Sequence, residues 1–589
     1  MSIDERVKNT PQCDWPVVDS ERSGAGKFLA LYGGEHIAAT EFVIGAALAQ
    51  YGCSASDILI GLLVGNLLAT LLFALLCAPI GVRTGLTLYT YLGKVVGVKV
   101  QKLYNIIFGI GFAAIAALGI SVSATAIRRV LNAPIQHEWY PTSIKFVLIV
   151  LVLGAVVVIV AANGFNAVSK FSTKCVPWMI CLFALGFVCV LPQVAEATGF
   201  GSIRSAGDVY RLLNERIWTG TVPEGAAKLG IGHVIAFAVV CNLAVHLGLN
   251  DMSIFRYAKS EKYGYTPAIG MFVGHYFAWI SAAVMGATAA ALLNTDLMLL
   301  DSGEVTFTVL GYAGLLGVVI AGWTTANPTI YRVALSFNNV FSKFTYKQMT
   351  YIMGSIITVI ACFPAVQRAA TVINYCGLLV IGMGAVCVAD YIIFPKIGYT
   401  RYWNLYKKND LNWAALVSWG LSIACFALLL IWEPIHQNFW FIPVYLLPII
   451  SYTVLAGRMG AGEKYPEQER EQEAYEKALL KYVTENRAEP VKAEKTAMIK
   501  GLDCIRYMML ACMFLVGFAF WTGSIDTDTM KAGEAAATAL YFVFTIIAFV
   551  LEEKQEVKLL NNEEIEYENN DIRLDRASDD GACAQSCAE

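Results

Sequence analysis

Long blocks of apolar residues, separated by shorter polar connections, follow one another along the chain. Each block holds about 20 residues, which is the length of helix that crosses a hydrocarbon core of about 30 Å. Fourteen such blocks can be recognised, and each predicts a membrane-spanning helix. They lie at about residues 27–50, 57–80, 103–127, 143–162, 175–194, 231–250, 266–293, 305–327, 348–366, 371–394, 412–432, 438–456, 505–523 and 534–551. The pattern predicts an all-α polytopic membrane protein.

The polar segments divide the chain into zones. Residues 466–486 carry opposite charges four residues apart, a pattern typical of a solvated helix, and they lie in a charged segment between the twelfth and thirteenth blocks. The zones that we expect are a polar arm at 1–26, a ten-helix core at 27–394, helices 11 and 12 at 395–456, the charged segment at 457–504, helices 13 and 14 at 505–551, and an acidic tail at 552–589.

Composition and charge agree with a membrane protein. The 589 residues are 57% hydrophobic and 15% charged, whereas soluble domains have about 25% charged residues. Lys and Arg gather in the arm, in the charged segment and in alternate connections, which predicts a plasma-membrane protein with both termini in the cytoplasm. The sequence has no P-loop, GxSxG or HExxH motif, so we expect neither an enzyme nor an ATP-driven pump. No nucleic-acid partner is expected, and the oligomeric state stays open.

The first apolar block is unusually polar at its centre. It contains Gly33, Gly34 and His36 together with the carboxylates Glu35 and Glu41. A charge at the centre of a bilayer costs about 2.5–3.5 kcal/mol on insertion scales. A pair of glycines is a place where a helix can unwind. Broken, polar membrane helices form the ion and substrate sites of secondary transporters, so this block predicts such a site.

Two later blocks carry related signals. Helix 8 contains the adjacent hydroxyls of Thr324 and Thr325 shortly after Ala321, and hydroxyl and carbonyl oxygens are the ligands that a sodium ion needs. The alternative is that each threonine bonds its own i−4 carbonyl, as helical threonines often do. Helix 6 is interrupted by Asn242 and His246. Breaks in helices 1 and 6 are typical of a five-plus-five inverted-repeat transporter.

The sequence WTTANPTIY at 323–331 resembles helix 8 of the nucleobase:cation symporter family, in particular its purine/cytosine permease branch. Four further segments resemble motifs of that family in the same order, and the resemblance extends over about residues 20–456. These segments are 251–257, 270–275, 389–394 and 412–420. The resemblance implies a leucine-transporter-type fold with broken helices 1 and 6, to which this chain adds four C-terminal helices. It also implies import of a nucleobase or related heterocycle with a coupling cation, by alternating access.

The resemblance also implies site residues. The ion ligands would be Gly34, Ile37, Ala38, Ala321, Thr324 and Thr325. The substrate residues would be Glu35, Phe108, Phe112, Asn242, His246 and Asn327. Helix 3 departs from the family because it offers Phe108 and Phe112 but no tryptophan or amide. A phenylalanine can stack on a heterocycle, but the hydrogen bonds must then come from helices 1, 6 and 8.

Several alternatives stay open at this stage. Glu35, Glu41 and His246 are candidates for proton coupling, because burial favours a neutral carboxyl group and histidine titrates near neutral pH. The coupling ion is therefore Na⁺ or H⁺, and no other metal or cofactor is expected. A transporter of the same fold for an amino acid or quaternary amine is the alternative function, and a membrane sensor is a weaker one. Asp251 and Arg256 are expected to form a gating or anchoring ion pair, and His275 to be a neutral interhelical histidine.

Overall fold

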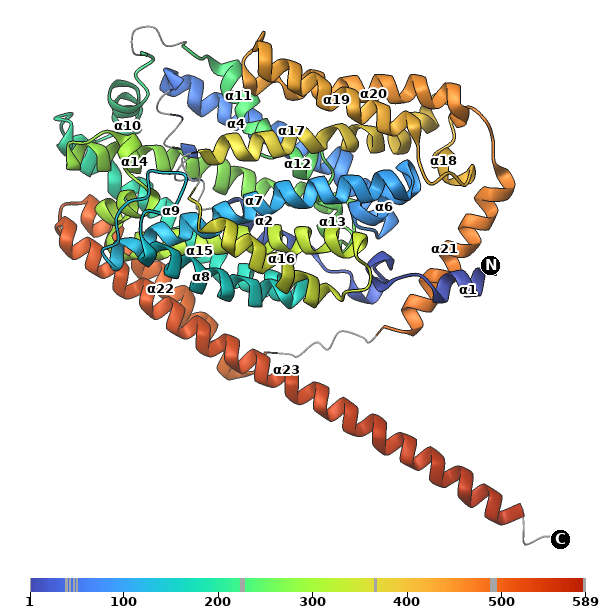
Figure 1. Ribbon diagram of the computed structural model, residues 1–589. Helices are drawn as coiled ribbons and strands as arrows, with labels where there is room; N and C mark the ends of the chain where they lie inside the picture. The colour runs from blue at the N-terminus through green and yellow to red at the C-terminus, as the bar shows by residue number, and fades with distance from the viewer. Residues whose placement is uncertain are drawn as a thin grey trace.

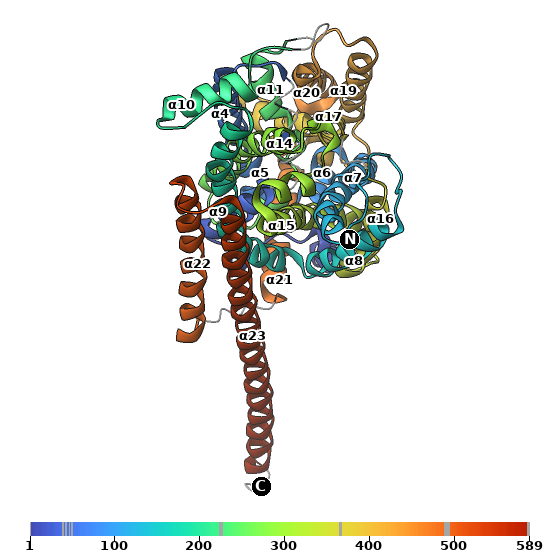
Figure 2. The same ribbon diagram turned by 90° about the vertical axis from the view of Figure 1, so that its left-hand side faces the viewer.

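The computed structural model describes residues 2–37, 41, 44–45, 48, 51–222, 228–364, 368–487 and 495–585. This described part is built from helices, with two isolated bridges and no extended strand. The helices lie side by side in one bundle, from which the long C-terminal helix projects (Figure 1). In the orthogonal view the last two long helices stand together along one side of the bundle (Figure 2).

The longer helices begin and end close to the apolar blocks. Their bounds are α2 Ala25–His36, α4 Ala55–Leu72, α5 Ala78–Thr84, α6 Leu88–Val96, α7 Val98–Val130, α8 Ile144–Ala162, α9 Gly164–Ala197, α11 Ile231–Val240, α14 Trp279–Leu293, α15 Ser302–Val340, α16 Tyr346–Ala361, α17 Ala369–Val388, α19 Trp413–Trp432, α20 Phe441–Ala456, α21 Pro466–Glu485, α22 Ala497–Trp521 and α23 Thr527–Gln585. Short helices are α1 Ile3–Lys8, α10 Ala206–Leu212, α12 Leu243–His246, α13 Met252–Phe255 and α18 Trp403–Tyr406.

Within the described ranges, 11 helices are long and apolar enough to cross a membrane. The other three predicted spans correspond to α2, to the broken pair α11 and α12, and to α16, which are shorter. The prediction of an all-α polytopic protein with about 14 spans therefore agrees with these helices. The acidic tail expected from residue 552 onwards is helical in the structure, because α23 continues through it to Gln585.

Helix 1 breaks later than expected. The prediction placed the break at Gly33 and Gly34, but α2 continues through both glycines, and Ile37 is the residue that leaves the helix, with φ −95° and ψ 66°. A Cβ atom on Gly33 would lie 2.9 Å from a methyl carbon of Val176 in α9, and one on Gly34 would lie 3.1 Å from Ser172. The glycines therefore let α2 approach α9 closely. Helix 6 is broken as predicted, with Asn242 non-helical between α11 and α12.

The centre of the bundle is formed by α7 and α15, which pack along much of their length. Both helices are buried more fully than the peripheral spans. A hydrogen bond joins them where Ser123 of α7 donates to the Val319 carbonyl of α15 at 3.1 Å. Small polar residues are the usual means by which membrane helices pack closely, so this contact holds α7 against α15.

The charged segment folds back onto the N-terminal arm. Helix α21 corresponds to the predicted solvated helix, and it packs against α1 (Figure 1). The Arg6 guanidinium lies 3.7 Å from the centre of the Tyr475 ring, and Thr10 and Tyr475 share a hydrogen bond of 2.8 Å. A small buried apolar cluster completes this contact, formed by Val7, Val18, Leu479 and Val483. The arm is thus fixed by a segment that lies 465 residues further along the chain at the Thr10–Tyr475 contact.

The last two spans pack on each other and on α9. The Trp178 indole of α9 donates to Thr538 of α23 at 3.1 Å, and the Tyr541 hydroxyl donates to the Lys174 carbonyl at 2.7 Å. Lys174 also forms an ion pair of 2.7 Å with Glu552. Helices α22 and α23 therefore hold the outer face of α9, the helix whose inner face receives the two glycines of α2.

Candidate ion and substrate site

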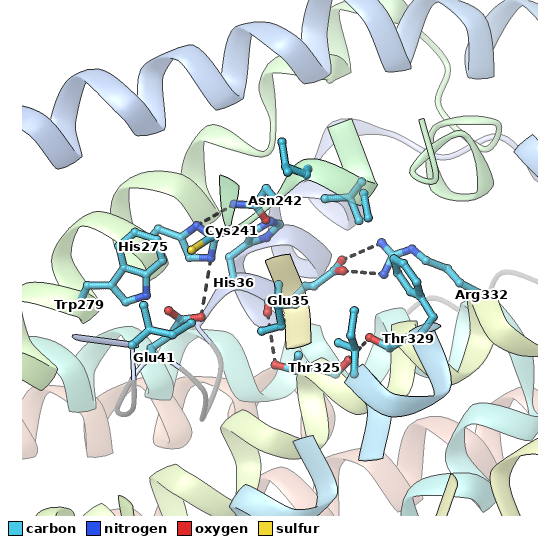
Figure 3. A pocket seen from close by; sticks show the side chains of 17 residues that line it. Glu35, His36, Glu41, Cys241, Asn242, His275, Trp279, Thr325, Thr329 and Arg332 are labelled. Atoms are coloured by element: carbon cyan, nitrogen blue, oxygen red, sulfur yellow. Dashed lines mark hydrogen bonds and ion pairs between the residues drawn. The ribbon is translucent and has the colours of Figure 1, made fainter. Parts of the chain in front are cut away.

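A cavity of about 90 Å³ lies where the end of α2 meets α7, α12, α14 and α15 (Figure 3). The helix breaks place polar groups on its wall, because Glu35 and His36 lie in the last turn of α2 and the non-helical Asn242 lies between α11 and α12. Its lining includes Glu35, His36, Glu41, Phe112, Ile115, Cys241, Asn242, His275, Trp279, Thr325, Thr329 and Arg332. Four predicted site residues are among them, namely Glu35, Phe112, Asn242 and Thr325, together with the proton candidate Glu41.

One side of the cavity brings together oxygens from helices 1 and 8. The Thr325 hydroxyl donates to the Ala321 carbonyl at 2.9 Å and lies 3.3 Å from the Glu35 carbonyl. Glu35 is in the last turn of α2, where carbonyls have no partner within the helix. The C-terminal end of a helix also carries a partial negative charge, which favours a cation. This oxygen cluster has the chemistry that an alkali cation requires.

The other predicted ion ligands are placed less favourably or are not described. The Thr324 hydroxyl donates to the Ile320 and Ala321 carbonyls at 3.0 and 3.1 Å, so both threonines bond their own i−4 carbonyl, which is the alternative considered for them. Thr325 differs because its hydroxyl also reaches the Glu35 carbonyl. Gly34 packs against α9, and Ile37 forms the end of α2, with its N–H bonded to the Gly33 carbonyl. Ala38 lies outside the described residues.

A buried arginine that was not predicted lies beside this oxygen cluster. Arg332 of α15 donates two hydrogen bonds to the Glu35 carboxylate, at 2.6 and 3.1 Å, and a third of 2.5 Å to Asp251. The side chains of Arg332 and Asp251 are 1% and 0% exposed, and that of Glu35 is 11% exposed. The hydropathy pattern places Arg332 in a connection, because the apolar block ends just before Pro328. Apolar residues continue on both sides of Arg332. This pattern could have predicted that the membrane helix extends past Pro328 and contains Arg332.

The opposite side of the cavity carries a second carboxylate. Glu41 lies 3.7 Å from Nε2 of His275, which precedes α14 in the same span. Nδ1 of His275 lies 2.9 Å from the Asn242 amide nitrogen (Figure 3). An amide nitrogen only donates, so Nδ1 accepts and Nε2 carries the proton that faces Glu41. His36 also lines this part, with Nδ1 3.0 Å from the Tyr32 carbonyl. His275 therefore bonds between helices as predicted and also contributes to the cavity wall.

Three predicted substrate residues lie behind the wall and do not line the cavity. Phe108 stacks on the far side of Phe112, with ring centroids 4.0 Å apart. His246 bonds the backbone through both ring nitrogens, to the Val239 carbonyl at 3.1 Å and to the Leu247 N–H at 2.7 Å. The ring is thus neutral in these hydrogen bonds, and His246 is not among the residues that line the cavity, so the geometry gives no support to its predicted contact with the substrate or to a role in proton transfer.

Asn327 is also buried elsewhere than predicted. In the amide orientation that satisfies both ends, its nitrogen donates to the Val157 carbonyl and its oxygen accepts from Trp323, each at 3.0 Å. It therefore joins α15 to α8. The expected Asp251–Arg256 ion pair is replaced as well. Asp251 bonds Arg332, whereas Arg256 donates to the Tyr257 and Tyr331 hydroxyls at 2.9 and 3.1 Å.

Comparison with known proteins gives structural neighbours only. No family model and no curated protein matches the sequence. A structure of Mhp1, a nucleobase-cation-symport-1 family transporter, closed with bromovinylhydantoin bound, aligns with a TM-score of 0.60 and 14% identity, covering 79% of this chain and 99% of that one. The inward-facing Mhp1 structure aligns at 0.54 with 17% identity, covering 78% and 96%.

A third neighbour is a Na⁺-coupled sialic acid symporter in its substrate-bound outward-open state. It aligns with a TM-score of 0.53 and 12% identity, covering 78% of this chain and 94% of that one. All three neighbours are membrane transporters and none is an enzyme. At these identities the similarity concerns the fold. The chain therefore has the leucine-transporter-type fold over 79% of its length.

Proposed function

We propose that this protein is a secondary active symporter that imports a nucleobase or a related small heterocycle together with a cation, by alternating access. The observation that carries the proposal is the contact between Thr325 and the end of α2. There the Thr325 hydroxyl and the Ala321 carbonyl of α15 meet the Glu35 carbonyl of α2 at the wall of a cavity inside the bundle. Secondary transporters place coupling ions at such broken helices.

Sodium is the coupling ion that we favour. Carbonyl and hydroxyl oxygens suit an alkali cation, and the proposed ligands are the Thr325 hydroxyl with the Ala321 and Glu35 carbonyls. Proton coupling through Glu35 or Glu41 is the rival. The neighbouring sialic acid symporter is Na⁺-coupled, which supports the proposal without deciding it. The excess of Lys and Arg in the arm and in 457–504 supports a plasma-membrane orientation with both termini in the cytoplasm.

A small heterocycle suits the cavity wall. Phe112 offers an aromatic face, and Asn242 offers an amide oxygen. The buried Trp279 indole N–H also lines the cavity and has no hydrogen-bond partner within the described residues, so it can donate to a ring acceptor. Flat rings with both donors and acceptors match these groups. An amino acid or amine is the second candidate, because one fold serves chemically different substrates in the neighbours.

The experiment is uptake and thermal stability of purified protein in sodium and in choline buffer. Thr325→Val removes one hydroxyl at nearly constant volume, and Thr358→Val is the matched control, since Thr358 bonds the Gly354 carbonyl of its own helix α16. We expect sodium to raise the thermal stability of the wild type and of Thr358→Val. The stability of Thr325→Val should be the same in sodium and in choline. Equal uptake by wild type and Thr325→Val without any ion gradient would overturn the proposal.

A further inference from the structure

We propose that helix α21 and the N-terminal arm form a latch that keeps the cavity closed on the side of the arm, so that α21 controls how often the transporter opens there. The inference rests on the proposed transport function and concerns the regulation of the same site. It starts from the position of the arm. The arm leads directly into α2, and α1 and α21 lie together at one end of the bundle (Figure 1).

One carboxylate of the arm holds the helices on one wall of the cavity. Asp14 accepts hydrogen bonds from the Asn339 amide at 2.8 Å and from the Thr90 hydroxyl at 3.0 Å. Asn339 lies in the last turn of α15, and its own amide oxygen accepts from Gln101 and Asn105 of α7 at 3.0 and 2.8 Å. The arm is therefore tied to α7 and α15, which both line the cavity further along their length.

The next part of the arm is bonded to the helices of the facing wall. The Val17 N–H donates to the Gly85 carbonyl at the end of α5, at 2.9 Å. The Ser23 N–H donates to the Tyr257 carbonyl just after α13, at 2.7 Å. The arm then enters α2, whose last turn carries Glu35 on the cavity wall.

The arm thus bridges two groups of helices, α7 with α15 and α2 with α5 and α13. Alternating access moves one group of helices against another around a fixed site. Opening the cavity on this side would therefore have to break the contacts of the arm with one of the two groups. The arm is placed to oppose that step.

Helix α21 decides how firmly the arm is held. Its apolar cluster with Val7 and Val18 contacts the arm before and after Asp14 in sequence. Arg487, directly after α21, forms an ion pair of 2.9 Å with Glu21 of the arm. The arm is therefore supported on both sides of the carboxylate that bonds α15, and losing α21 would leave that carboxylate on a poorly supported strand of chain.

The contact between α21 and the bundle is open enough to be released. A cavity of about 630 Å³ lies between the arm, α21 and the ends of α5 and α6. The ion pair across it joins Lys94 to Glu476 at 2.7 Å, with side chains that are 19% and 44% exposed. Ion pairs as exposed as this one contribute little to stability. Helix α21 can thus leave the arm while the packing of the membrane helices stays intact.

The test is the rate at which Cys241 reacts from each side of the membrane. This half-buried cysteine lines the cavity. The full-length protein is reconstituted in vesicles of known orientation in choline buffer, and a membrane-impermeant methanethiosulfonate reagent is added on one side at a time. Labelling is read by peptide mass spectrometry. Neither an ion nor a substrate is needed.

The variants weaken the latch at separate points. Leu479→Ala truncates a buried residue of the apolar cluster, and Leu480→Ala is the matched control because the same truncation falls on a neighbour that is 45% exposed. We expect Leu479→Ala to raise Cys241 labelling from the arm side on the order of tenfold, which corresponds to about 1.4 kcal/mol of lost docking. Asp14→Ala should raise it as well, and Leu480→Ala should leave it unchanged.

A second cysteine separates opening from loss of structure. Cys189 on α9 is fully buried outside the cavity lining, so it should stay unlabelled while the bundle is folded. If Leu479→Ala exposes Cys189, the milder Tyr475→Phe decides together with Asp14→Ala, because it removes only the hydroxyl that bonds Thr10.

Two results would overturn the latch. One is arm-side labelling of Cys241 that stays at the wild-type rate in the α21 variants and in Asp14→Ala. The other is a rise of equal size from both sides of the membrane, which would mean that the variants only loosen the bundle. Failure of the symport proposal is distinct, because it appears as a wild type whose stability does not respond to sodium, whatever the labelling shows.

Discussion

Replacing Arg332 by methionine tests the buried charge network most directly. Methionine retains the length of the side chain but removes the three hydrogen bonds to Glu35 and Asp251. Hydrogen bonds to charged groups contribute about 1.5–3 kcal/mol each, but they are not additive here because the partners share one guanidinium. Removing one partner of a buried ion pair costs about 3–5 kcal/mol, since a buried charge is left without compensation. With two carboxylates left uncompensated, we expect Arg332→Met to lose at least this amount.

A double-mutant cycle separates the network from simple packing loss. Glu35→Gln alone removes one charge and leaves Arg332 paired with Asp251, so a smaller loss of about 1–3 kcal/mol is expected. The double variant should be clearly more stable than the sum of the two single effects predicts, because the second substitution removes a charge that the first left uncompensated.

The assay is reversible unfolding of the purified protein in mixed micelles, followed by intrinsic fluorescence. Arg332→Lys is the matched control for charge, and it should recover only part of the stability because an ammonium group cannot bond Glu35 with the planar, two-pronged geometry of arginine. The reasoning would be refuted if the effects of Arg332→Met and Glu35→Gln on the free energy of unfolding were strictly additive. It would also be refuted if Arg332→Met were as stable as the wild type.

Two further predictions concern packing outside the cavity. Burial raises the pKa of the Cys13 thiol in the arm to about 12, so it should react slowly with maleimide at neutral pH. Tyr475→Ala removes the ring and hydroxyl that hold Thr10 and the arm. The rate of Cys13 labelling, measured by peptide mass spectrometry, should then rise on the order of tenfold. An unchanged labelling rate would contradict this contact. Gly33→Ala should lower the melting temperature, at a cost of about 1–3 kcal/mol from overpacking, and Val176→Ala should restore it; a neutral Gly33→Ala would contradict the close approach.

Hydropathy was sufficient for the spans, because each must cover the same thickness of hydrocarbon. It was less informative about where a helix breaks. Gly33 and Gly34 are equally consistent with unwinding and with close packing, and only the neighbouring α9 decides between them. The break at Asn242 was predictable, because an amide inside an apolar membrane helix is costly unless the helix opens there or the amide finds a partner.

The candidate site was predictable where a family motif and a local polar signal coincide, as at Glu35 and Thr325. Arg332 was missed because a charged residue after a proline is typical of a connection, although Pro328 lies within α15. His246 and Asn327 lie outside the cavity lining because sequence gives the polarity of a helical residue but not the face on which it lies. Their partners are backbone carbonyls and the indole of Trp323, which no spacing rule identifies.

Helix α9 is packed on two faces, which couples the position of α2 to the position of the C-terminal helices. Its inner face receives α2 at Gly33, and its outer face is tied to α23 through Trp178 and Lys174. Any rotation of α2 against α9 is therefore also a displacement relative to two helices beyond the inverted repeat. The stiffness of that outer support becomes part of the free-energy difference between conformations. Under the proposed symport function, contacts of α22 and α23 with lipid or with another protein would alter the rate of transport without touching the cavity.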